Sequence, residues 1–227
     1  MTVDPMTIGR PGPAGSGATA LPIHLAAHLV GAYRWTEHRL FELTGAWAAE
    51  VPVPAVQVHL AGAAGQHAWH AELWAERLPV LDGVDPEALT RPLGPAMGPL
   101  LAALAGDPAA APAPAPAGDP AASGGHGVVQ RLTGLYRVVM PRLLTSYALH
   151  LTRVAPATDG PTIRALTLVS RDDLELWRAG EALLQEVLRR PHDVAVAAAV
   201  QQRLESVVVA EGAGPGLVPW PGEAPAG

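Results

Sequence analysis

One stretch bounded by prolines decides the fold class: PAVQVHLAGAAGQHAWHAELWAERL, residues 54–78. Pro54 suits the first turn of a helix, and Pro79 prevents the helix from continuing. Apolar residues recur along the stretch at spacings of three and four, the pattern of a helix that buries one face. The members of this stripe are Val56, Leu60, Ala63, His67, His70, Trp74 and Leu78. Two histidines therefore lie on the face that we expect to be buried.

Other segments carry the same periodicity and the same proline punctuation. The expected long helices cover 22–50, 127–154 and 161–190, and shorter helices are expected near 95–105 and over 192–210. Pro141 lies inside one of them and predicts a kink or a local break there. No segment alternates apolar and polar residues between hairpin turns, so no strand is predicted. The pattern indicates an all-α protein.

The lengths of the connections predict how the helices are arranged. Short links join the first helix to the second and the third to the fourth, which is typical of antiparallel hairpins. The long link between the second and third helices allows a crossover in a four-helix bundle, a single domain over 21–210. It contains a Pro/Ala-rich run at 106–124 that we expect to be a flexible linker. Residues 1–20 are expected to be a disordered leader and 211–227 a flexible tail.

Composition excludes several classes of function. The chain of 227 residues has no Cys, which removes disulfides, thiolate metal sites and Cys nucleophiles. A formal net charge of −6 argues against a nucleic-acid binder. No apolar run is long enough to span a bilayer and no targeting segment is found, so we expect a cytoplasmic protein without a membrane partner. Walker loops, dinucleotide fingerprints and nucleophile elbows are also missing from the sequence.

Each long helix carries, on its apolar stripe, a group that can bind a proton or a metal ion. These groups are Glu37, the pair His67 and His70, Tyr136, and Asp173, all near the middle of their helices. Mid-helix positions of a bundle converge at one level, and a buried carboxylate without a partner is costly. We therefore expect Glu37, His67, His70 and Asp173 in one cluster, with Tyr136 at its edge.

Two interpretations of this cluster remain open. Residues three apart on a helix lie about 5–6 Å apart at Cβ, so His67 and His70 can reach the same ion. Imidazoles suit zinc, copper, iron or nickel, and two histidines with a carboxylate suit non-haem iron(II). The same four side chains can equally form a metal-free cluster of hydrogen bonds and ion pairs.

The motifs resemble those of the ferritin-like superfamily. The resemblance lies in Glu37 of the first helix, QHAWHAELW (66–74) of the second and RDDLELWRAGE (171–181) of the fourth. That family binds a pair of metal ions with one Glu from each of two helices and Glu-x-x-His motifs from the other two. By this resemblance Glu37 matches the first-helix carboxylate and His70 matches the His of the second-helix motif.

Several positions depart from the family's pattern. His67 stands where the second-helix motif has Glu, and Tyr136 falls where the third helix has Glu. Asp173 falls on the Glu of the fourth-helix motif, and Leu176 replaces its His. The resemblance therefore implies ligands for one metal ion rather than for two.

Two functions follow from the sequence. In the first, a metal-dependent oxidoreductase binds one iron, manganese, zinc or copper ion through Glu37, His67, His70 and Asp173 and acts on a small-molecule substrate. Asp173 then serves as a ligand or a general base, and Tyr136 as a proton donor. In the second, the chain is a metal-free scaffold or cargo protein with a degenerate site. A homodimer or a protein partner is compatible with both. A four-helix metal protein of the DinB type is a third possibility, but proteins of that type use three histidines, and a third histidine is missing from the apolar stripes here.

Overall fold

The computed structural model describes residues 21–106, 123–212 and 214–220. Within these ranges the regular structure is helical, apart from an isolated bridge between Leu81 and Val84. The prediction of an all-α protein is confirmed. No helix in this part of the chain is both long and apolar enough to cross a membrane. The predicted leader, nearly all of the predicted linker and the last seven residues lie outside the described residues.

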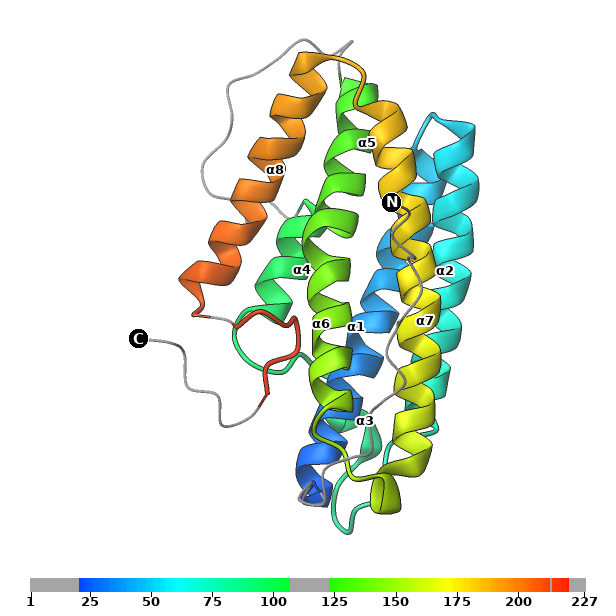
Figure 1. Cartoon of the computed structure of the whole chain (residues 1–227), viewed down its shortest axis with the longest axis vertical. Coiled ribbons are helices and arrows are strands. Elements are labelled where there is room, and N and C mark those ends of the chain that lie inside the picture. The colour runs from blue at the N-terminus through cyan, green and yellow to red at the C-terminus, as the bar shows by residue number, and fades with distance from the viewer. Residues whose placement is uncertain (1–20, 107–122, 213, 221–227) are drawn as a thin grey trace, which may run out of the picture.

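Long helical segments form a bundle, shown in Figure 1. They are α1 (Ile23–Glu50), α2 (Pro54–Ala75), the continuous segment α5 (Ser123–Thr133), η3 (Gly134–Val139) and α6 (Met140–Leu151), and α7 (Pro156–Val187). Helices α1 and α7 run in one direction, and α2 and α5–α6 run in the other (Figure 1). A tight link makes α1 and α2 an antiparallel pair, whereas α2 ends and α5 begins at opposite ends of the bundle (Figure 1).

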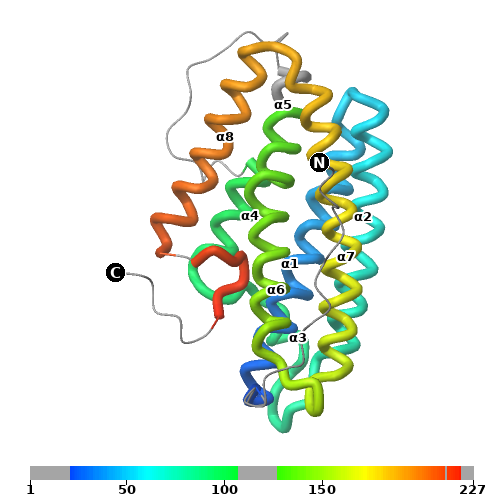
Figure 2. The backbone as a smooth tube through the Cα atoms, in the orientation of Figure 1, coloured from blue at the N-terminus to red at the C-terminus, as the bar shows by residue number. Residues whose placement is uncertain are grey.

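The long connection contributes its own packing elements. It carries α3 (Pro86–Leu89), which the sequence analysis did not predict, and α4 (Met97–Ala105). Helix α3 lies so close to α1 that a Cβ on Gly31 would stand 2.1 Å from the Leu89 carbonyl oxygen. Helices α4 and α8 (Pro191–Ala210) pack beside α5 and η3, as the tube in Figure 2 shows. These helices widen the bundle without entering the space between its four long segments.

Pro141 is accommodated by a π-helical turn, η3, immediately before it. The Met140 amide bonds to the carbonyl of Leu135, five residues back, and Pro141 has no N–H to donate. The Tyr136 carbonyl consequently has no helical donor, and Trp177 of α7 donates its Nε1–H to it over 2.7 Å. Gly180 of α7 lets the two segments approach closely, since a Cβ there would lie 2.3 Å from the Tyr136 ring.

Residues 214–220, part of the tail that we expect to be flexible, pack against α6 in the structure. Within residues 214–220, the Leu217 amide donates to the Arg142 carbonyl (3.0 Å) and the Val218 amide donates to Ser146 Oγ (2.9 Å). The side chains of Leu217 and Val218 are buried against the core. Two aliphatic side chains and two hydrogen bonds hold this segment on α6, which its Gly/Pro-rich composition does not reveal.

Candidate metal centre

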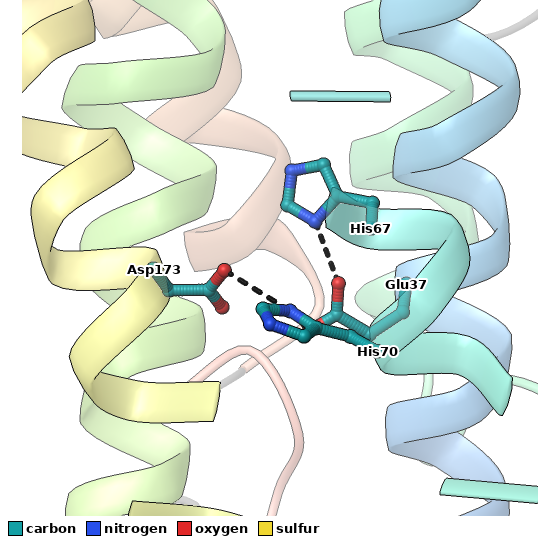
Figure 3. A group of neighbouring side chains, drawn as sticks. All are labelled: Glu37, His67, His70 and Asp173. Carbon is teal, nitrogen blue, oxygen red and sulfur yellow. Dashed lines mark hydrogen bonds and ion pairs between the residues drawn. The ribbon is translucent and has the colours of Figure 1, made fainter. Parts of the chain in front are cut away.

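Four buried ionisable side chains meet between α1, α2 and α7, as Figure 3 shows. Glu37 comes from α1, His67 and His70 from α2, and Asp173 from α7, and each is 0% exposed. One candidate ligand atom from each residue lies within 4.8 Å of those of the other three. The structure thus brings together the four residues that the apolar stripes had singled out.

Local helix geometry places His67 and His70 on the same face of α2. His67 and His70 are three residues apart on α2, so both side chains lie on the face that packs into the bundle. Their ring centroids are 6.3 Å apart and the ring planes are nearly perpendicular, at 81°. One short sequence motif therefore supplies two imidazole groups to a single site.

Glu37 has hydrogen-bond partners at both carboxylate oxygens. Its Oε2 lies 2.6 Å from Nδ1 of His67, and its Oε1 accepts a hydrogen bond of 2.6 Å from the hydroxyl of Tyr147 on α6. Nδ1 of His70 lies 3.6 Å from Oε1. The sequence analysis did not assign Tyr147 to the site. Tyr147 follows Tyr136 and Leu143 at helical spacings of seven and four residues, so the sequence did indicate that it lies on the same face of its helix.

His70 lies between two carboxylates of α7. Its Nδ1 is 3.4 Å from Oδ1 of Asp173, and its Nε2 is 3.5 Å from Oδ2 of Asp172. The Asp172 side chain is 27% exposed, whereas that of Asp173 is fully buried. A carboxylate behind the second nitrogen of an imidazole fixes the tautomer and orientation of a metal-binding histidine. Asp172, which sequence reasoning missed, therefore belongs to the surroundings of the site.

The charges inside the cluster shift its pKa values in opposite directions. Burial raises the pKa of Glu37, but the charges and hydrogen bonds of His67 and His70 outweigh it and lower the pKa to about 2. Burial and the negative charge of Glu37 raise the pKa of Asp173 to about 6. Burial lowers the pKa of His70, but Asp173 and Glu37 outweigh it and raise the pKa to about 10. At neutral pH a protonated His70 thus lies between two ionised carboxylates.

Several polar atoms of the cluster have no hydrogen bond. Among the described residues these buried atoms include Nε2 of His67, Nδ1 of His70 and both carboxylate oxygens of Asp173. Buried polar atoms are nearly always satisfied in proteins, so a concentration of exceptions at one place indicates a missing partner. Two imidazoles and two carboxylates form a donor set that suits a transition-metal ion. The residues present fit such an ion.

Tyr136 is buried beside the cluster, but its hydroxyl has a different partner. The hydroxyl lies 2.6 Å from Nε2 of His59, a half-buried histidine of α2. Burial and the negative charge of Asp173 raise the pKa of Tyr136 above its ordinary value, so the hydroxyl stays protonated. Leu176, at the position of the family's second histidine, is a buried aliphatic residue.

Comparisons of the chain with protein-family models, with curated proteins and with solved structures gave no match. The function therefore has to be inferred from the chemistry of the site, because a helical bundle alone supports many functions. A cluster of this composition can hold a metal ion, or it can remain a closed network of ion pairs and hydrogen bonds.

Proposed function

We propose that this chain is a ferritin-like helical protein that binds one transition-metal ion and acts as a metal-dependent oxidoreductase. The ligands are Glu37, His67, His70 and Asp173. The observation that carries the proposal is the convergence of these buried groups within 4.8 Å, with unsatisfied nitrogen and oxygen atoms among them. The long crossover between two antiparallel helix pairs supports the ferritin-like assignment.

The protein's own residues then have distinct roles around the ion. A bound iron, manganese or copper ion supplies one-electron redox chemistry, and zinc supplies a Lewis acid. Tyr147 holds Glu37 through its hydroxyl, and Asp172 orients His70 through Nε2. Asp173, with a pKa of about 6, is either a fourth ligand or a general base that exchanges a proton near neutral pH. Tyr136, whose protonated hydroxyl lies 2.6 Å from Nε2 of His59, is the proposed proton donor.

Metal analysis of the purified full-length protein tests the proposal. After expression with iron, manganese, zinc and copper supplied, we expect about one ion per chain to survive dialysis, and EDTA to lower the melting temperature. His70→Ala removes an imidazole ligand and should abolish retention of the ion. The matched control is His24→Ala, which changes an exposed histidine of α1 and should leave retention unchanged.

The redox part of the proposal needs a separate measurement. Protein loaded with the retained metal should change its optical or electron paramagnetic resonance spectrum reversibly on reduction and reoxidation. A retained ion that is zinc alone, with no such change for iron-, manganese- or copper-loaded protein, would contradict oxidoreductase activity while leaving the metal site in place.

A metal-free scaffold is the second candidate, and one observation favours it. Both oxygens of Glu37 already have close partners, His67 and Tyr147, each at 2.6 Å, so this carboxylate is satisfied without an ion. In this alternative no metal is retained and EDTA leaves the melting temperature unchanged. His70→Ala still destabilises the protein, because Asp173 would lose its cationic neighbour.

A further inference from the structure

A groove lies between the end of α2 and the beginning of α7, about one helical turn from His70. Its volume is about 470 Å³, and its walls include Leu73, Arg77, Pro161, Arg164, Ala165 and Leu168. Helices α2 and α7 pack against each other along the bundle (Figure 1). A volume of this size is typical of a site for a small organic ligand.

The walls of the groove change in chemistry along its length. The pair His70 and Asp172 sets the register of the antiparallel helices α2 and α7. Continuing from that pair, Leu73 and Leu168 come next, and the guanidinium-bearing residues Arg77 and Arg164 follow one turn later. The apolar part of the groove therefore lies between the two arginines and the metal centre.

The two arginines are poorly neutralised by the protein. Within the part of the chain that the structure describes, the one ion-pair contact of Arg77 is with the exposed Glu76, at 4.0 Å, and its Nε is buried without an acceptor. Arg164 is exposed and has no ion-pair or hydrogen-bond partner among residues 21–106, 123–212 and 214–220. Guanidinium groups present planar forks of donors that match a carboxylate. Two of them at one end of an apolar groove are complementary to an anion with an apolar body.

We infer that this groove binds an amphipathic carboxylate. The carboxylate lies between Arg77 and Arg164, and the apolar chain runs along Leu73 and Leu168 toward the pair of His70 and Asp172. From the level of Arg77 to that of His70 is seven residues of helix, about 10 Å, which a chain of about eight carbon atoms spans. That such a carboxylate is the substrate of the metal centre rests on the proposed function; its binding in the groove does not.

Titration calorimetry of the EDTA-treated full chain with octanoate tests the inference. We expect one octanoate per chain, bound at least ten-fold more tightly than acetate or octan-1-ol, because one lacks the apolar chain and the other the charge. Arg77→Gln and Arg164→Gln should each weaken octanoate binding at least ten-fold. Arg39→Gln is the matched control, since Arg39 is a partly exposed arginine of α1, paired with Glu42, and should leave binding unchanged.

A variant inside the groove separates binding from folding. Leu168 is 38% exposed, so Leu168→Glu places a carboxylate in the groove at a position that tolerates a polar group. This variant should keep the circular dichroism spectrum and melting temperature of the wild type and lose octanoate binding. Octan-1-ol binding as tightly as octanoate, unchanged affinity in both arginine variants, or no binding at millimolar octanoate would each overturn the inference.

The test of octanoate binding and the test of metal retention can fail independently of each other. If the wild type retains no metal but binds octanoate through the arginines, the groove is upheld and the assignment of a substrate falls. If metal is retained and octanoate does not bind, the metal centre stands and the groove inference is overturned.

Discussion

His70 and His150 are both buried in the bundle, yet their environments favour a protonated imidazole at His70 and a neutral one at His150. Carboxylate oxygens of Asp173 and Glu37 lie 3.4 and 3.6 Å from Nδ1 of His70, and they raise its pKa to about 10 against the effect of burial. Nδ1 of His150 lies 3.1 Å from the hydroxyl of Tyr33. Burial lowers the pKa of His150 to about 4, because the charge of Asp159 offsets it only in part. The partner, rather than burial, decides which histidine carries the proton.

The groups that surround the two histidines also differ in charge. His150 is enclosed by neutral aromatic groups, with the ring of Trp220 from the C-terminal segment 5.5 Å away and that of Tyr33 5.7 Å away. His70 is surrounded by acids from two other helices. Two imidazoles among carboxylates form a candidate site for an ion, whereas the neutral aromatic groups around His150 offer no carboxylate ligand.

Removing the ionic histidine should have the largest effect on stability. His70→Ala leaves Asp173 and Glu37 buried without this cation, so we expect the metal-free protein to lose about 3–5 kcal/mol of unfolding free energy. Urea denaturation of EDTA-treated protein measures the loss. A stability within 1 kcal/mol of the wild type, as we expect of the surface control His24→Ala, would show that the cluster is not paired as described.

The pH dependence of stability should have opposite signs at the two histidines. The folded pKa of His150 lies below the ordinary value of 6.5, so its contribution is complete above pH 6.5 and is lost as pH falls toward 4, by about 3 kcal/mol. The folded pKa of His70 lies above 6.5, so its contribution is complete below pH 6.5 and is lost as pH rises through about 10.

Urea denaturation across this pH range, with the wild type compared with His150→Gln and His70→Gln, measures the two contributions. The difference for His150→Gln should shrink toward acid, and that for His70→Gln should shrink toward alkali. If the loss of unfolding free energy changed with pH in the same direction for both variants, the two environments would not differ as described.

The smallest expected loss of stability comes from removing a tyrosine hydroxyl from each cluster, that of Tyr147 near His70 and that of Tyr33 beside His150. The Tyr147 hydroxyl donates to the ionised Glu37 (2.6 Å), whereas the Tyr33 hydroxyl bonds to the neutral His150 (3.1 Å). We expect Tyr147→Phe to cost about 2 kcal/mol and Tyr33→Phe about 1 kcal/mol, because hydrogen bonds to charged groups contribute more. Thermal unfolding of both variants measures the order, and a larger loss for Tyr33→Phe would reverse it.

Some residues of the candidate centre could be predicted from the sequence, and others could not. Glu37, His67, His70 and Asp173 could be placed on buried faces, because the spacing of apolar residues indicates which side of a helix packs. Tyr147 lies on a stripe like any core tyrosine, and its contact with Glu37 depends on the axial offset of α6 against α1. No sequence pattern records that offset.

Asp172 shows the same limit at the edge of the site. It lies one residue from Asp173 and so points in a different direction around α7. It reaches Nε2 of His70 only because α2 and α7 pack side by side in this register. The groove with Arg77 and Arg164 depends on the same packing, since its two walls are more than eighty residues apart along the chain.

Short-range pattern was sufficient for the helical class, for the ends of α1 and the start of α2 at Pro54, and for the burial of the ionisable groups. These properties depend on backbone sterics and on periodicity within a few turns. Helix α2 ends at Ala75, three residues before the predicted Leu78. Three-dimensional packing decided the partners of each group, the hydrogen bond from Trp177 to the Tyr136 carbonyl, and the placement of Leu217 and Val218 on α6. These features join segments that are distant in the chain, and their geometry exists only after the helices have docked.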